Sequence, residues 1–108
     1  MLDLIGEHLA AIGLLCRQFR VVRLELFGSA ARGDFASGTS DLDFFVTFEE
    51  LGWVGVSDRY FGLLHGLEDL LSRRIDLVER SAVTHTIFLE VADHHRELIY
   101  AAPVAKAS

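Results

Sequence analysis

Two aspartates spaced by two residues, Asp41 and Asp43, are the side chains of this sequence best suited to chemistry. They lie in a strand-like run, 41–46, in which Leu42, Phe44 and Val46 would point away from the acids into a core. Alternate side chains of a strand share a face, with Cα atoms about 6.6 Å apart. Carboxylates at that separation can converge on divalent cations. Acid pairs at this spacing also occur on solvated strand faces, so the pair alone does not establish a metal site.

A Gly-Ser pair, Gly28 and Ser29, precedes the aspartates and suggests a phosphate-binding turn. The pair follows the apolar run 21–27, which predicts a strand, and opens 30–33, where we expect a short helical turn with Ser29 as N-cap. The free N–H groups and positive dipole end of such a turn favour a polyphosphate. Taken alone the motif could be an ordinary capped turn. Together with the acid pair it predicts a nucleoside triphosphate site.

A third acid, Asp76, lies in the segment 74–79. Alternation places Ile75 and Leu77 inward and Asp76 outward on a predicted strand. If this strand lies beside the one that carries the aspartate pair, three carboxylates cluster. Their mutual repulsion then requires neutralising cations or a protonated acid. Divalent metal is the resolution that we expect.

Three segments together resemble the minimal nucleotidyltransferase domain of the polymerase-beta-like superfamily. They are residues 28–34 (GSAARGD), 40–46 (SDLDFFV) and 75–78 (IDLV). Near the end of the chain, residues 92–101 resemble the closing helix of small antitoxin members that are paired with HEPN-domain toxins. The resemblance covers nearly the whole chain. It implies a small α/β (α+β) fold with a mixed sheet of three or more strands covered by helices.

The resemblance also implies roles for six residues. Three carboxylates would be catalytic and would bind two Mg²⁺ ions, and three residues of the turn would bind the phosphates of the substrate ATP. The carboxylates are Asp41, Asp43 and Asp76, and the turn residues are Gly28, Ser29 and Arg32. Arg32 could instead pair with Asp34 to hold the loop.

The antitoxin relatives transfer AMP from ATP to a tyrosine of the partner HEPN ribonuclease toxin, which silences it. The resemblance implies the same activity for this chain. A tyrosine hydroxyl is a sensible acceptor because its pKa near 10 eases metal-assisted deprotonation. Two alternatives stay open: an antitoxin that acts by binding alone, and nucleotidyl transfer to a small molecule such as an aminoglycoside.

One departure from the family pattern concerns the spacing of the motif. Eleven residues, 30–40, separate Ser29 from Asp41, one more than in many relatives. The extra residue fits the flexible stretch 37–39, which can absorb it without shifting either flank. If it instead rotated Asp41 off the metal face, the chain would be a relative that only binds.

Composition predicts one small domain over residues 1–101, followed by a disordered tail, 102–108. A mean hydropathy of +0.32 is high for a small monomer and suggests exposed apolar surface. We therefore expect a hetero-oligomer with a protein partner, or else a homodimer. The net charge of −6 and the single lysine, Lys106, argue against nucleic-acid binding.

Two further expectations concern localisation. No apolar run approaches the roughly 18 residues of a membrane span, and the N-terminus lacks a signal-peptide pattern. Cys16, the only cysteine, lies in an apolar helical stretch and suggests a core position in a reducing cytoplasm.

Helical periodicity predicts three longer helices. They cover residues 2–19, a segment from Ser57 or Asp58 as N-cap to Ser72, and residues 87–100, after which Pro103 ends the helix. The expected apolar face of the middle helix comprises Phe61, Leu64, Leu67, Leu70 and Leu71. We expect Trp53, in the preceding loop, to form a lid over the core, with an exposed partner contact as the alternative.

Overall fold

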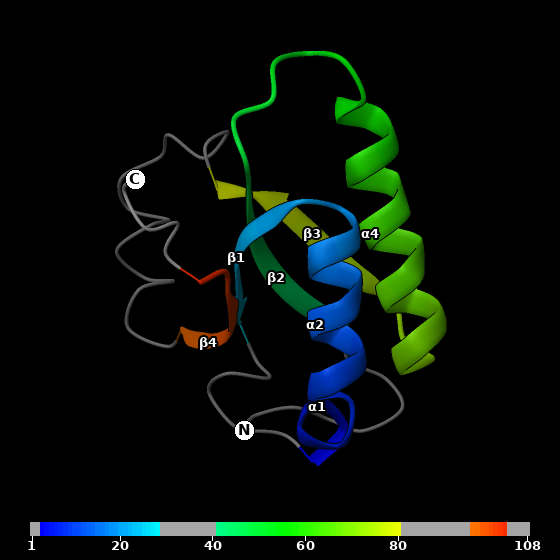
Figure 1. Ribbon diagram of the computed structural model, residues 1–108. Coiled ribbons are helices and arrows are strands. Elements are labelled where there is room, and N and C mark those ends of the chain that lie inside the picture. Colours follow the sequence, from blue (N-terminus) through cyan, green and yellow to red (C-terminus); the bar gives the residue numbers. More distant parts are fainter. Residues whose placement is uncertain (1–2, 29–40, 81–95, 104–108) are drawn as a thin grey trace.

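The structure, a computed structural model, describes residues 3–28, 41–80 and 96–103. Four strands form one sheet in the order β3-β2-β1-β4 (Figure 1). They are β1 (Val21–Phe27), β2 (Leu42–Phe48), β3 (Ile75–Glu79) and β4 (Glu97–Ala101). β2 and β3 pair in parallel, and β1 pairs antiparallel with both β2 and β4. The mixed sheet confirms the predicted fold class.

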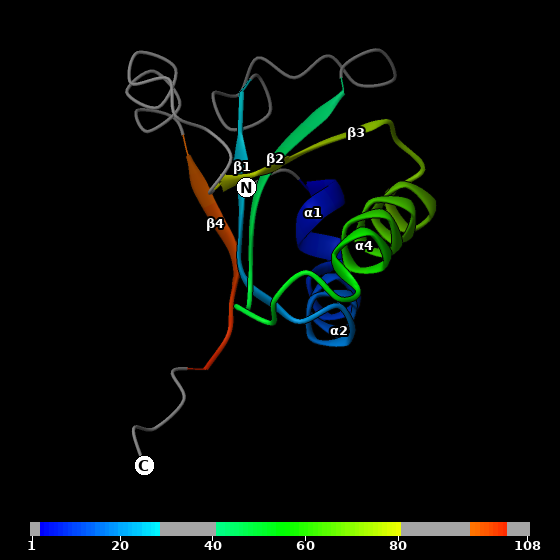
Figure 2. The ribbon, with the colours of Figure 1, turned by 90° about the horizontal axis from the view of Figure 1, so that it is seen from above.

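Within the described ranges, three helices cover a single face of this sheet: α1 (Asp3–Glu7), α2 (Leu9–Gln18) and α4 (Val56–Leu71) (Figure 2). The core lies between the helices and the sheet. Inward-facing residues of the strands are buried there as alternation predicts, namely Leu24, Leu26, Leu42, Phe44, Val46, Ile75 and Leu77. None of the helices in the described ranges is long and apolar enough to cross a membrane.

The N-terminal helix is divided at His8, which corrects the single helix expected over residues 2–19. His8 has φ −115° and ψ 11°, outside the helical range, and its N–H bonds to the carbonyl of Ile5 three residues back. The Nδ1 atom of its ring lies 2.8 Å from the carbonyl oxygen of Leu4. The low helix propensity of Gly6 weakens the same turn.

The helix predicted over residues 87–100 is wrong in its last part, where 97–101 form strand β4. Tyr100 pairs with Leu24 of β1, and Glu97 pairs with Leu26. Without β4 this side of β1 would be an unpaired edge, so sheet pairing prevails over the helical periodicity. Pro103 therefore follows a strand, while residues 87–95 and 104–108 of the predicted helix and tail lie outside the described ranges.

Helix α4 differs from its prediction at its start and in its apolar face. Gly55, at φ 80°, is the N-cap in place of Ser57 or Asp58, and no side chain caps the helix. Leu63, Leu67 and Leu71 form the fully buried stripe, at the four-residue spacing that faces one side of a helix. Leu64 and Leu70 pack at its margin, whereas Phe61 is half exposed.

The expected lid over the core is also wrong, because Trp53 is 91% exposed. It lies in the loop between β2 and α4, which projects beyond the end of the sheet at the top of Figure 1. Gly52 and Gly55 both have positive φ, and these bends turn the loop away from the sheet. The alternative of an exposed contact therefore fits the structure.

Two glycines of α4 allow α2 and its C-cap to pack closely against this helix. A Cβ atom on Gly62 would collide with the ring of Phe19, and one on Gly66 would lie 2.8 Å from Cδ2 of Leu15. The two positions are four residues apart, so both glycines lie on the side of α4 that contacts α2. Small residues are therefore required at this contact.

We predict that Gly62→Ala destabilises the protein by about 1–2 kcal/mol, because overpacking against the Phe19 ring outweighs the gain in helix propensity. Gly6→Ala is the matched control, since nothing lies within 4 Å of the added Cβ atom. The control should gain up to about 1 kcal/mol. Urea unfolding measures both changes, and a stabilised Gly62→Ala variant would contradict the packing described here.

The buried thiol of Cys16 predicts a loss of stability at alkaline pH. Burial raises the pKa of this thiol to about 12, against an opposing effect of neighbouring Arg17. The unfolded thiol ionises near pH 9, so between that pH and about 12 only the unfolded state gains a thiolate. The free energy of unfolding should therefore fall by about 2 kcal/mol more between pH 8 and pH 10.5 in the wild type than in Cys16→Val. Equal losses in both proteins would show that the thiol is solvated.

Candidate active site

The parallel register of β2 and β3 places two of the predicted carboxylates side by side. Asp43 is the register partner of Asp76, on strands that lie about 4.8 Å apart. The neighbours of Asp76, Ile75 and Leu77, are buried against the helices, so both acids belong to the opposite face of the sheet. Asp43 is half-buried and Asp76 is exposed.

The first predicted acid, Asp41, directly precedes β2 and is exposed. The next residue, Leu42, donates its N–H to the carbonyl of Arg74 at 3.1 Å. Within the described ranges, no three His, Cys, Asp or Glu side chains are arranged to hold a metal ion. The structure thus brings Asp43 and Asp76 together in register and does not add Asp41 to form a three-carboxylate cluster.

Gly28 connects the phosphate turn with the carboxylate pair. It follows the end of β1, where Phe27 is paired with Asp43, and it has φ +74°. A Cβ atom here would collide with Oδ2 of Asp43 and would lie 3.3 Å from its Cγ. The position therefore requires glycine for both its backbone conformation and its space. The other predicted turn residues, Ser29 and Arg32, lie outside the described residues.

A small aromatic cluster lies beside the carboxylates on the same face. The rings of Phe27 and Phe45 stack with centroids 4.0 Å apart and an interplanar angle of 14°, and Val78 packs against them. The guanidinium carbon of Arg80 lies 5.6 Å from the centroid of the Phe45 ring. The sequence analysis did not predict this cluster. The signal for it was the two-residue spacing of Asp43 and Phe45 along β2, which places both side chains on the same face.

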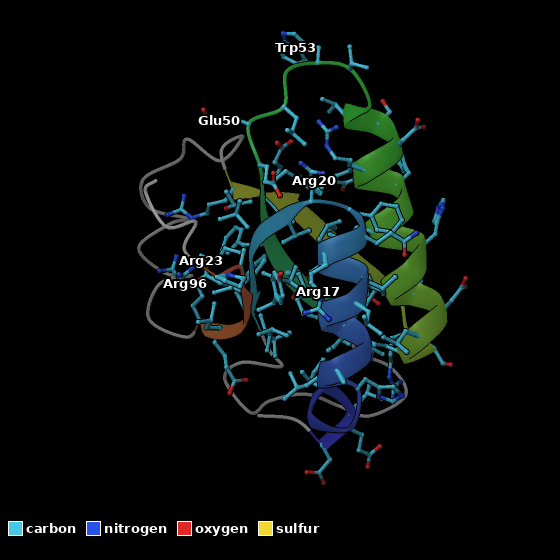
Figure 3. The ribbon with its side chains drawn as sticks, in the orientation of Figure 1. Arg17, Arg20, Arg23, Glu50, Trp53 and Arg96 are labelled. Carbon is cyan, nitrogen blue, oxygen red and sulfur yellow. The ribbon has the colours of Figure 1, made fainter. Side chains whose placement is uncertain are left out.

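A buried carboxylate, Glu25, also lies on this face and links β1 with β4. The side chain of Arg96 donates from Nε to Oε2 of Glu25 at 2.9 Å, and Nε of Arg23 lies 3.2 Å from the same oxygen. Figure 3 shows the two arginines side by side near β4. Glu25 is only 5% exposed, so its charge must be compensated. The sequence held a local signal only for Arg23, two residues from Glu25 on the same strand, because Arg96 is remote in the chain.

Tyr60 of α4 supports β3 from the helix side. Its hydroxyl donates to the carbonyl oxygen of Leu77, one residue after Asp76. Burial raises the pKa of Tyr60, and the negative charges of Asp76 and Glu79 raise it further. The hydroxyl therefore stays protonated and keeps its donor role at neutral pH. This contact fixes the strand that carries Asp76.

Comparison with protein families gives one match of wide coverage. The profile of the nucleotidyltransferase domain family matches residues 11–99. A search among curated proteins found no match.

Solved structures with the same fold include a candidate minimal nucleotidyltransferase, which is 31% identical to this chain. The similarity covers 95% of this chain and 97% of that one, with a TM-score of 0.70. A toxin–antitoxin complex with AMP-PNP matches at a TM-score of 0.66 and 20% identity, covering 87% of this chain and 73% of that one.

A third structure with this fold comes from Shewanella oneidensis. It contains a tri-AMPylated HEPN toxin in complex with its MNT antitoxin, and it matches at a TM-score of 0.62 and 17% identity. The similarity covers 91% of this chain and 73% of that one.

The close approach of Gly28 to Asp43 can be tested with a double-mutant cycle. We predict that Gly28→Ala costs about 2–3 kcal/mol, which combines the positive φ with the collision against the Asp43 carboxylate. In an Asp43→Ala background only the conformational cost of about 1 kcal/mol should remain. Urea unfolding of the four proteins gives the coupling energy. Equal costs in both backgrounds would refute the contact.

Proposed function

Since this chain belongs to the nucleotidyltransferase domain family, we propose that it transfers AMP from ATP to a tyrosine hydroxyl of a HEPN-type toxin and thereby neutralises it. The observation that carries the proposal is the register pairing of Asp43 with Asp76, next to the backbone of Gly28. The AMP-PNP complex and the AMPylated toxin among the structural relatives support the choice of ATP and of AMP.

The carboxylate pair fits a divalent cation, because hard cations such as Mg²⁺ prefer oxygen ligands. We propose that Asp41 and Asp43 hold two Mg²⁺ ions and that Asp76 is a ligand on the acceptor side. When bound, the ions would neutralise the β and γ phosphates and lower the pKa of the acceptor hydroxyl. In this proposal, the bound Mg²⁺ ions would let Asp41 approach the other two acids, since their positive charge removes the repulsion between the carboxylates.

In the proposed reaction the tyrosine oxygen attacks the α phosphorus of ATP. The bond from this phosphorus to the oxygen that bridges to the β phosphorus breaks, and pyrophosphate leaves. Asp76 takes the proton of the hydroxyl. The turn at Gly28 and Ser29 seats the leaving pyrophosphate through its N–H groups, and Arg32 adds a positive charge. The products are O-adenylylated tyrosine and pyrophosphate.

The proposal predicts that Asp43→Asn and Asp76→Asn each reduce AMP transfer at least about 100-fold, because each removes an anionic ligand worth several kcal/mol in the transition state. The measurement uses ATP labelled at the α phosphate, Mg²⁺ and the proposed partner, a HEPN-domain toxin. Label on the partner and its loss on chelation of the metal are the expected results.

Asp69→Asn, on the exposed side of α4, is the matched control and should transfer AMP at the wild-type rate. An antitoxin that acts by binding alone would neutralise the toxin equally well with Asn at both site positions and would leave no label on it. Label on an added aminoglycoside in the absence of protein partner would indicate a small-molecule transferase. Either outcome would contradict the proposed function.

A further inference from the structure

The loop between β2 and α4 presents a large apolar group to solvent. Trp53 is 91% exposed and Val54 is 88% exposed, and Leu51 nearby is 41% exposed. Figure 3 shows Trp53 at the tip of the loop, pointing away from the sheet and the helices. An exposed tryptophan with apolar neighbours is typical of a binding surface, because tryptophan contributes strongly to the affinity of protein interfaces.

Several contacts hold this loop in a defined shape. The guanidinium group of Arg59 donates to the carbonyl of Val54 at 3.0 Å and lies 3.5 Å from the carbonyl of Gly52. The backbone N–H of Val56 bonds to the carbonyl of Trp53 at 3.3 Å, and Gly55 adopts φ +80°. A loop with this many internal bonds loses less conformational entropy when it binds a partner.

Beside the loop lies an open cleft of about 540 Å³. Apolar side chains line part of it, and its polar lining includes three glutamates: Glu49, Glu50 and Glu79. Arg59 is the one basic residue among the lining residues, and it bonds to the loop carbonyls. Arg20 pairs with Glu49 at 3.3 Å, whereas Glu50 is exposed. The cleft therefore favours a positively charged partner surface.

The loop and the cleft lie at the opposite end of the sheet from the carboxylates. Asp43 and Phe48 are separated by five residues along β2, or about 16 Å of strand. The loop follows Phe48 and extends further in the same direction (Figure 1). A protein that binds the loop therefore leaves the carboxylate end accessible to nucleotide.

We propose that the Trp53 loop and its acidic cleft are the docking site for the acceptor protein, which inserts Trp53 into an apolar pocket and places basic residues in the cleft. The proposal rests on the proposed function, since its partner is the toxin that receives AMP. Docking at one end of the sheet raises the effective concentration of the acceptor tyrosine at the other. Which protein is modified then depends on its fit to the docking surface as well as on the presence of a reactive tyrosine.

Trp53 is the only tryptophan of the chain, so it reports directly on the proposed contact. The chain labelled with 5-fluorotryptophan gives one ¹⁹F resonance, which should shift when the proposed HEPN-domain partner is added. Trp53→Ala should raise the Kd for this partner at least about tenfold in calorimetry. The matched control is Leu14→Ala, which truncates an apolar side chain that is 61% exposed on α2 and should change the Kd less than twofold.

The charge of the cleft is tested with Glu50→Lys. This variant should bind the partner more weakly than the wild type at low salt, and the difference should shrink as the salt concentration rises. A short tyrosine peptide cannot make the docking contact. The rate of AMP transfer to this peptide should therefore be equal in the wild type and Trp53→Ala. With the folded partner, Trp53→Ala should raise KM and leave kcat unchanged.

The outcomes separate this inference from the proposed function. An unchanged Kd of Trp53→Ala, or a ¹⁹F resonance that does not move on saturation, overturns the docking site even if AMP is transferred. Wild-type binding that depends on Trp53, without any transfer of label, supports the docking site and overturns the proposed function. If the wild type does not bind the partner, both are overturned.

Discussion

The parallel pairing of β2 with β3 is the constraint on which the rest of the structure depends. One face of the pair buries apolar residues against the helices, and the other face brings Asp43 next to Asp76. A shift of the register by one residue would turn the acids into the core and the apolar residues into solvent. Burial of the apolar residues in the core therefore also fixes the positions of the two carboxylates, although these residues lie on the other face of the sheet.

Further contacts support this arrangement from both sides of the sheet. Tyr60 joins α4 to the strand of Asp76, and Gly28 allows the end of β1 to lie against Asp43. On the far side of β1, the ion pair of Glu25 with Arg96 attaches β4. The carboxylates thus lie on strands that are fixed to their neighbours, and a chemically useful geometry requires such rigid support.

Much of this arrangement could be predicted from the sequence where the signal was local. Alternation located three strands and assigned Asp43 and Asp76 to the correct face, because a strand buried on one side fixes the orientation of every residue. The predictions failed where a distant segment decides the structure. Residues 97–101 are compatible with helix or strand, and the open edge of β1 makes them a strand. The ion pair of Glu25 with Arg96 and the exposure of Trp53 likewise depend on tertiary contacts that no local pattern encodes.

The central claim is that Asp43 and Asp76 together form a divalent cation site beside a bound nucleotide. Electron paramagnetic resonance can count the Mn²⁺ ions that bind in the presence of a non-hydrolysable ATP analogue, since Mn²⁺ shares the preference of Mg²⁺ for carboxylate oxygen. The account predicts tight, stoichiometric Mn²⁺ binding by the wild type and its loss when both aspartates are replaced by asparagine. Equal Mn²⁺ binding by the wild type and the doubly substituted protein would contradict it.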